Sequence, residues 1–293
     1  MYKQKQTPGR QGLGVALVLF STICLSVEPV AAKIAYRGGA TVMTTLTLRY
    51  ILAAAIFWLL ILAGGYAFRL PRRQLLAVTA LSLGTQTLTV MALFEAFRYI
   101  PAGMAILFLY FYPTVVTILA FFFLKEPFTW RKGLALLLTL AGCAVILGQP
   151  VNSLDMRGVV LSLTAALTYA VFLVGSTRLL ATIQIPVYNA YVSTILALAV
   201  GGLALMRGQL NLSFSSEALV AIGVLGIVST VLAMAALLRG IKEIGASRAA
   251  IISTFEPVAT AVLGFLVLGE SLTAWQMIGG AAVLAGVFLQ RRA

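Results

Sequence analysis

Ten apolar runs, each close to the length of a membrane-spanning helix, fill this sequence of 293 residues. A helix needs about 20 apolar residues to cross the hydrocarbon core of a bilayer, and only short breaks with glycine, proline or charged residues separate the runs. Hydrophobic residues make up 61% of the chain and charged residues 10%, so a water-soluble domain could not hide its apolar surface. We therefore predict an all-α membrane protein, with spans near residues 12–33, 41–63, 74–97, 102–124, 131–148, 157–177, 187–206, 217–239, 246–268 and 274–290.

Composition also excludes several classes of function. The net charge of +13 does not indicate a nucleic-acid partner, because the basic residues form short clusters between apolar runs rather than one continuous face. The chain contains no histidine, which is the commonest general base and metal ligand. Cys24 and Cys143 lie inside apolar runs without the spacing of a metal site. We expect no metal, no cofactor, no catalytic residue and no enzymatic activity.

Lysine and arginine predict the orientation in the membrane. If the N-terminus lies inside the cell, fifteen of these residues fall on the inner side and five on the outer side, with Arg49 inside a span. Such a bias marks the cytoplasmic face, so we predict a multi-pass protein with both termini in the cytoplasm. The first run also resembles a signal peptide, but it matches a later span at a fixed offset and is therefore expected to be retained.

That match is part of an internal repeat at an offset of 144 residues, which extends without gaps from the first run to the last. Matches among alanine, leucine and valine are common in such a composition. Prolines and acidic residues are scarce, so the pairs Pro113/Pro257 and Glu126/Glu270 indicate duplication.

The repeat predicts an inverted architecture. Residues 1–150 and 151–293 each contain five spans, and an odd number forces the second repeat to enter the membrane from the opposite side. Inverted repeats of this kind are common in secondary transporters, where one half can close one face as its twin closes the other.

In each repeat a proline enters a long apolar stretch and a glutamate follows its end. The motifs are Tyr112-Pro113-Thr114-Val115 through Phe123-Leu124-Lys125-Glu126-Pro127, and Glu256-Pro257-Val258 through Leu268-Gly269-Glu270-Ser271-Leu272. Together with Arg49-Tyr50 and Lys33, they resemble the EamA-like family of the drug/metabolite transporter superfamily over essentially the whole chain.

The resemblance implies ten helices around a central cavity built from helices 1–4 and 6–9, with helices 5 and 10 outside it. It also implies a bacterial inner membrane and the export of amino acids or related metabolites. A tryptophan-glycine pair common in the first helix of the family is replaced here by Leu25-Ser26, followed by Glu28-Pro29. This departure concerns the substrate rather than the fold.

Charged residues within spans are the strongest candidates for function, since each costs about 2.5–3.5 kcal/mol at the bilayer centre without a partner or a water-filled cavity. Glu256 precedes Pro257, and its counterpart in the first repeat is Tyr112. Its carboxyl group either lines a cavity, where it meets an ammonium group or carries a proton, or is buried against a neighbouring helix. Glu28 also lacks an acidic counterpart in the other repeat.

Arg49 aligns with Ser193 and has two equally supported roles, to clamp a substrate carboxylate or to neutralise Glu28 or Glu95. Gln86 is a further polar side chain in mid-span. Several tyrosines either line a pocket for an apolar group or pack between helices. They are Tyr110, Tyr112, Tyr169, Tyr188 and Tyr191, of which Tyr112 and Tyr169 join the candidate substrate or coupling site.

Polar and proline residues present in both repeats are assigned to the shared scaffold or to gating. They are Pro113, Pro257, Glu126 and Glu270.

These features predict a secondary active transporter in the lipid bilayer that exports a small metabolite, such as an amino acid or an amphipathic compound, by alternating access. Proton coupling through Glu256 or Glu28 is a hypothesis, since burial favours the neutral form of a carboxyl group.

Three alternative functions have different requirements. A phosphorylated-sugar or nucleotide-sugar carrier of the same fold would need several cationic groups in the cavity. A membrane enzyme would need a nucleophile beside a base, and a non-transporting membrane subunit would not need an inverted duplication. The sequence is compatible with a monomer or a homodimer.

Overall fold

The computed structural model describes residues 8–96, 98–100, 102–147, 155–268 and 273–291, which form helices joined by turns and contain no strand. Within these residues, eight stretches are long and apolar enough to cross a membrane. They are Arg10–Arg37, Val42–Gly64, Arg72–Ala96, Met104–Leu124, Trp130–Leu147, Met156–Leu179, Ile185–Met206 and Ser216–Ile244. The prediction of an all-helical multi-pass membrane protein is confirmed. The last two predicted spans correspond to α13 (Ala246–Ser253) with α14 (Glu256–Leu268), and to α15 (Ala274–Arg291).

We call each membrane-spanning stretch, whether one helix or several consecutive helix segments, a rod. Three of these rods are interrupted just before a proline. The first consists of α1 (Pro8–Ser26) and α2 (Glu28–Arg37), with Pro29 in the first turn of α2. The others are α6 (Ala102–Leu109) with α7 (Tyr112–Leu119), and α13 with α14. Proline cannot donate a backbone hydrogen bond, and its ring clashes with the carbonyl four residues earlier. The prolines therefore set the level at which each rod is broken.

Two further rods contain a wide π-helical segment. They run through α4 (Arg72–Leu81), η1 (Ser82–Thr87) and α5 (Leu88–Ala96), and through α11 (Ser216–Val224), η3 (Leu225–Leu232) and α12 (Ala233–Ile244). At the repeat offset of 144, η1 falls inside η3. Another π segment, η2 (Ala120–Leu124), ends the rod that begins with α6. Single π turns inside helices occur frequently at functional sites.

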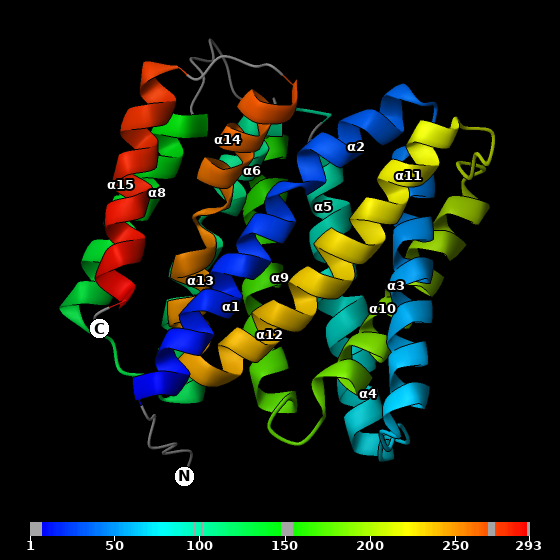
Figure 1. Cartoon of the computed structure of the whole chain (residues 1–293), viewed down its shortest axis with the longest axis horizontal. Coiled ribbons are helices and arrows are strands. Elements are labelled where there is room, and N and C mark those ends of the chain that lie inside the picture. Colours follow the sequence, from blue (N-terminus) through cyan, green and yellow to red (C-terminus); the bar gives the residue numbers. More distant parts are fainter. Residues whose placement is uncertain (1–7, 97, 101, 148–154, 269–272, 292–293) are drawn as a thin grey trace.

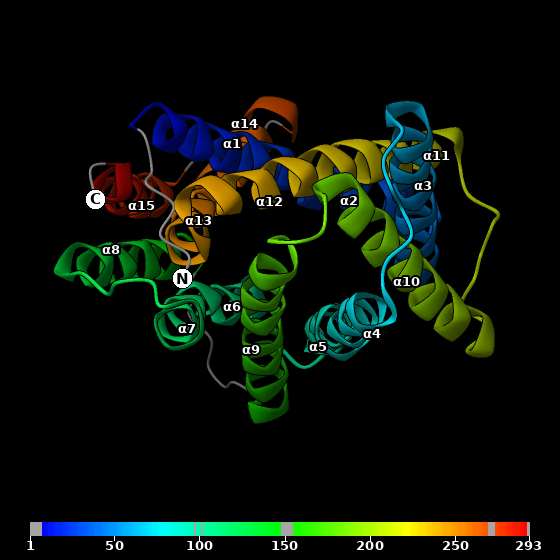
Figure 2. The same ribbon diagram turned by 90° about the horizontal axis from the view of Figure 1, so that it is seen from below.

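The remaining rods are continuous, and equivalent rods of the two repeats run in opposite directions (Figure 1). They are α3 (Val42–Gly64), α8 (Trp130–Leu147), α9 (Met156–Leu179) and α10 (Ile185–Met206). In Figure 1, α1 rises whereas its counterpart α9 descends, and α3 descends whereas α10 rises. The start of α1 and the end of α15 lie toward the same end of the molecule. Seen from that end, α8 and α15 form one flank and α3 and α10 the other (Figure 2).

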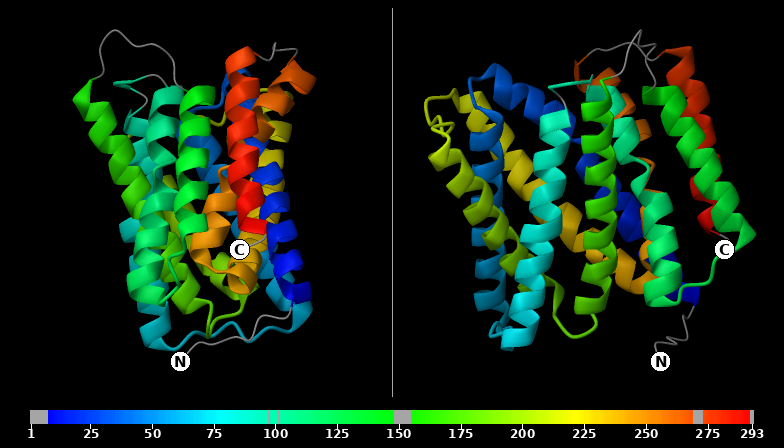
Figure 3. Two further views of the ribbon diagram at one scale, coloured as in Figure 1. Left: turned by 90° about the vertical axis from the view of Figure 1, so that its left-hand side faces the viewer. Right: turned by 180° about the vertical axis from the view of Figure 1, so that it is seen from behind.

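Helices α8 and α15 pack side by side through glycines (Figure 3). A Cβ atom added to Gly142 would lie 2.6 Å from the Gly279 carbonyl oxygen, and one added to Gly279 would lie 2.6 Å from the Gly142 oxygen. Gly286, the repeat counterpart of Gly142, faces Ala135, the counterpart of Gly279, with its added Cβ 3.0 Å from the Ala135 oxygen. The contact between Gly142 and Gly279 is thus repeated as the contact between Gly286 and Ala135, in which the residues of the first and second repeats have exchanged places.

This packing gives a first prediction. Gly279→Ala should destabilise the protein by about 1–3 kcal/mol, because the new methyl group meets backbone rather than a flexible side chain. Gly280→Ala is the matched control, since its Cβ would meet Val258 at 3.7 Å, an ordinary contact. Thermal unfolding in detergent micelles measures both variants. Equal unfolding temperatures for the two would contradict the close approach.

Large apolar side chains cover the outside of the bundle. Leu62, Phe122, Leu137 and Leu198 are each more than 65% exposed. Meanwhile Tyr188, Phe57 and Ile252 are fully or almost fully buried between helices. An apolar surface outside a packed interior is the arrangement expected when lipid is the solvent.

Candidate functional site

The first element of the candidate site is an ion pair between two neighbouring rods. Glu28 is the first residue of α2, immediately after the break at Val27, and Arg49 lies within α3. The guanidinium group donates from Nη1 to Glu28 Oε1 at 2.7 Å and from Nη2 to Glu28 Oε2 at 3.1 Å. This two-pronged geometry is the strongest that arginine and a carboxylate can form.

Arg49 is further held from the second repeat. Its Nε donates to Thr230 Oγ1 at 3.1 Å, and the Thr230 hydroxyl itself donates to the Leu225 carbonyl at 2.9 Å inside η3. Only 7% of the Arg49 side chain is exposed, against 36% of Glu28. Arg49 therefore forms the ion pair with Glu28 that one of its two predicted roles requires. Glu95 pairs instead with Arg98, at 2.8 Å.

The second element is Glu256, the first residue of α14. It is partly exposed although it lies at the level of a helix break. The Tyr110 side chain lies close enough to its carboxyl group to interact with it. Glu28 and Glu256 are also close enough for their charges to interact, so the structure brings together the two acids that the sequence singled out.

Tyrosines from two helices connect these acids. Tyr112 packs edge-on against Tyr169, with ring centroids 4.8 Å apart, and the Tyr110 and Tyr112 rings are 6.3 Å apart. Tyr169 is stacked with Phe172 at 6.5 Å and is electrostatically coupled to both Glu28 and Glu256. Tyr110 and Tyr112 are buried, whereas Tyr169 keeps some exposed surface. We refer to Tyr110, Tyr112 and Tyr169 as the tyrosine cluster.

Other tyrosines from the sequence analysis lie away from this cluster. Tyr188 is buried and shares a hydrogen bond of 2.6 Å with Ser176. Tyr191 donates to the Phe68 carbonyl at 3.0 Å. Both contribute to packing between helices.

The paired prolines add backbone acceptors beside the acids. Pro113 and Pro257 have no N–H to give to the carbonyls of Leu109 and Ser253, four residues earlier. Both carbonyls lie at the breaks that precede Tyr110 and Glu256 along the chain. Acceptor groups from both repeats therefore flank the site.

Gln86 lies in η1 and is buried, and its Oε1 has no hydrogen-bond partner in the described part of the chain. Its counterpart at offset 144 is Thr230, the residue that holds Arg49. Sequence reasoning missed Thr230. A polar residue at matching positions of both repeats was the signal that could have identified it.

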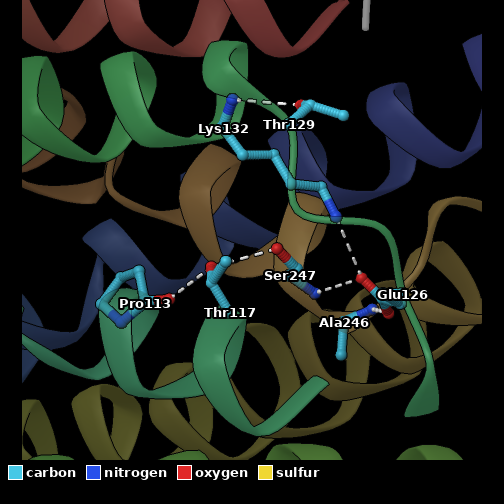
Figure 4. A network of polar contacts seen from close by, with 7 residues as sticks. All are labelled: Pro113, Thr117, Glu126, Thr129, Lys132, Ala246 and Ser247. Carbon is cyan, nitrogen blue, oxygen red and sulfur yellow. Dashed lines mark hydrogen bonds and ion pairs between the residues drawn. The ribbon is translucent and has the colours of Figure 1, made fainter. Parts of the chain in front are cut away.

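A third polar cluster joins the two repeats (Figure 4). It lies at the start of α13, just after the end of α12 that packs against Gly14 near the beginning of α1. The Glu126 carboxylate accepts hydrogen bonds from the backbone N–H groups of Ala246 at 2.8 Å and Ser247 at 3.3 Å, at the start of α13. Lys132 Nζ lies 3.4 Å from its Oε2. The Ser247 hydroxyl bonds that of Thr117 at 3.0 Å. We call this cluster the Glu126 latch.

The latch depends on a glycine. Gly245 has φ +85° and ψ 160°, and an added Cβ would lie 2.8 Å from Glu126 Oε1. This backbone region is open essentially to glycine alone. Glu270, the counterpart of Glu126, lies outside the described residues.

With this geometry established, comparison with known proteins identifies the family. The model of the EamA-like transporter family matches the chain twice, over residues 12–148 and 156–291. The chain belongs to the EamA-like transporter family. The resemblance read from the sequence is thereby confirmed, and both repeats are EamA units.

Relatives agree with this assignment. An uncharacterized transporter of Archaeoglobus fulgidus is 31% identical over 222 residues, covering 76% of this chain and 77% of the relative. The uncharacterized transporter YcbK of Bacillus subtilis is 29% identical over 279 residues, covering 91% and 88%. A protein of known crystal structure shares the fold, with a TM-score of 0.80 at 19% identity over 94% of this chain and 95% of that one.

Proposed function

We propose that this EamA protein is a secondary active transporter that exports a small metabolite, such as an amino acid or an amphipathic compound, by alternating access. It would cross the bacterial inner membrane ten times, with both termini in the cytoplasm. The two repeats would be inverted around a central cavity that contains Glu28, Arg49 and Glu256.

The observation that carries this proposal is the reversed direction of equivalent rods in the two EamA units (Figure 1). The exchanged contact pairs Gly142/Gly279 and Gly286/Ala135 support it as well, because a two-fold relation between the halves produces such pairs. In an inverted pair, any contact that closes one end of the cavity has a counterpart at the other end. The Glu126 latch is our candidate for such a closing contact on the cytoplasmic side.

Proton coupling is proposed to reside on Glu256. The groups that face it come from four rods and include no lysine or arginine of the described chain. They are Tyr110, Tyr112, Cys143, Tyr169 and, at longer range, Glu28. Glu28 is less suited to this role because it is engaged by Arg49.

A phosphorylated-sugar or nucleotide-sugar carrier is disfavoured. Phosphate recognition calls for several arginine or lysine side chains that are free to form paired hydrogen bonds. The described chain has two buried guanidinium groups. That of Arg49 already has partners in Glu28 and Thr230, and that of Arg248, which has unpartnered N–H groups, is one cation where a phosphate site needs several.

Transport by the purified protein is the direct test. Liposomes containing the protein are loaded with the twenty amino acids and a set of amines and amphipathic drugs, and the loss of each solute is followed by mass spectrometry against protein-free liposomes. We expect saturable loss of at least one solute, accelerated by a proton gradient directed into the vesicles. Glu256→Gln should lose that acceleration. Flux no faster than in protein-free liposomes for every solute would refute the transporter assignment, and a wild-type response of Glu256→Gln to the gradient would refute coupling.

A further inference from the structure

We propose that the transported solute carries an ammonium group on an apolar body of aromatic size and has no carboxylate, and that Glu256 binds the ammonium group inside the tyrosine cluster. This inference rests on the proposed function and specifies the substrate class of the same site. It selects one of the compound types that the sequence left open.

When Glu256 is ionised, the site carries one more negative charge than positive charges. Glu28 and Arg49 neutralise each other through their double hydrogen bond. Glu256 forms no ion pair with any lysine or arginine of the described chain. Opposite charges attract more strongly in a partly buried site than in bulk water, because the surroundings screen them less. An ammonium group placed beside Glu256 would gain this attraction, and an anion there would be repelled by the ionised Glu256 carboxylate.

The neutral polar groups favour the same kind of solute. The Leu109 and Ser253 carbonyls lack their helical donors because Pro113 and Pro257 cannot supply them. An ammonium group has three N–H donors and no acceptor, whereas a carboxylate has only acceptors. A surplus of acceptors at two helix breaks therefore suits an ammonium group.

The rings supply the apolar part of the site. Tyr112 and Tyr169 meet edge to face at 4.8 Å, and Phe172 extends the stack from Tyr169. Aromatic faces attract cations that lie within about 6 Å of a ring centroid. They also remove apolar groups from water, so the cluster suits an amine attached to a ring or to a chain of similar size.

A carboxylate on the solute would find no available cation beside Glu256. The paired N–H groups of Arg49 are bound to Glu28, and displacing them would leave Glu28 unpaired near Glu256. The other buried guanidinium of the described chain is that of Arg248. Its Nε and Nη2 atoms have no hydrogen-bond partner in the described part of the chain. Arg248 is not among the charged groups that act on Glu256, so we place it outside the site that holds the ammonium group.

Three matched compounds test the proposal. 2-Phenylethylamine carries the amine alone, phenylalanine adds a carboxylate to the same skeleton, and 3-phenylpropanoate keeps the carboxylate alone. Binding to the full-length protein in lipid nanodiscs is measured by isothermal titration calorimetry. We expect 2-phenylethylamine to bind at least tenfold more tightly than phenylalanine, and 3-phenylpropanoate not to bind. Phenylalanine binding as tightly as the amine, or no binding of the amine at millimolar concentration, would overturn the proposal.

Two variants of the protein test whether the ammonium group binds at Glu256. Glu256→Gln should weaken 2-phenylethylamine binding at least tenfold, whereas Glu95→Gln should leave it unchanged because Glu95 belongs to an exposed ion pair with Arg98. The comparison of ligands on the wild-type protein decides the substrate class even if Glu256→Gln folds poorly. If a well-folded Glu256→Gln variant binds 2-phenylethylamine as tightly as the wild-type protein does, the assignment of the ammonium contact to Glu256 is wrong. Failure of this proposal is distinct from failure of the transporter assignment, since saturable flux of phenylalanine without amine binding would refute only the former.

Discussion

Replacing Arg49 with alanine is expected to destabilise the protein by about 2–4 kcal/mol, because the variant leaves the Glu28 carboxylate without its partner inside the helix bundle. The loss is smaller than for a fully buried pair because 36% of the Glu28 side chain remains exposed to solvent. The Thr230 hydroxyl also loses the donor that it binds at 3.1 Å. Unfolding of the purified protein by denaturant in detergent micelles, followed by circular dichroism, measures the change.

The control for this prediction removes both charges. Arg49→Met combined with Glu28→Gln should recover most of the lost stability, since replacing both members of a buried pair is far less costly than removing one. Thr230→Val should cost about 1 kcal/mol for the single hydrogen bond. If the double variant is as unstable as Arg49→Ala, the loss arises from packing of the arginine side chain and not from the unpaired acid.

The spans could be predicted because the physical requirement is simple and local. A run of about 20 apolar residues satisfies the bilayer wherever it occurs, and eight of the predicted spans coincide with long apolar helices. The predicted ends of the spans were less accurate than their positions. The first span was predicted to end at residue 33, but helix continues to Arg37, because α2 keeps helical geometry where its side chains become polar.

The helix breaks were less visible in the sequence than the helices. Pro113 and Pro257 were recognised as matched positions, yet the spans around them were predicted as continuous. The break at Val27 has no counterpart in α9, where the residues aligned with Glu28 and Pro29 are Phe172 and Leu173. A proline inside an apolar run can bend, break or begin a helix segment, and the outcome depends on neighbouring helices.

The individual partners could not be predicted. The two alternatives for Arg49 were separated only by the crossing of α2 and α3, which sets whether residues 21 positions apart meet. Glu126 and Ala246 are 120 positions apart and belong to different repeats. The repeat pattern showed that Glu126 and Glu270 share a role, but not that Glu126 binds the start of a helix in the other half.

The latch gives the second prediction with a large expected effect. Gly245→Ala should open the end of the molecule at which Glu126 binds α13. Alanine at this backbone conformation costs about 1–3 kcal/mol, and its methyl group would lie against the Glu126 carboxylate. A change of 1.4 kcal/mol shifts an equilibrium tenfold. We therefore expect the open form to become at least about five times more populated.

Accessibility of a single cysteine reports this shift. Thr117 is 2% exposed and bonded to Ser247 within the latch, so Thr117→Cys in a variant lacking Cys24 and Cys143 should react slowly with a membrane-impermeant maleimide. Adding Gly245→Ala should raise that rate at least about fivefold.

Two further variants separate the latch from general strain. Gly208 also has a positive φ, +62°, but an added Cβ there meets open space, so Gly208→Ala should strain the backbone without changing the labelling rate. Glu126→Gln keeps the shape of the side chain and removes its charge, which weakens its bonds to the α13 N–H groups and its pairing with Lys132. It should raise labelling in the same direction as Gly245→Ala. If Gly208→Ala accelerates labelling as much, or Glu126→Gln leaves it unchanged, the Glu126 contact is a structural cap and does not close the transport path.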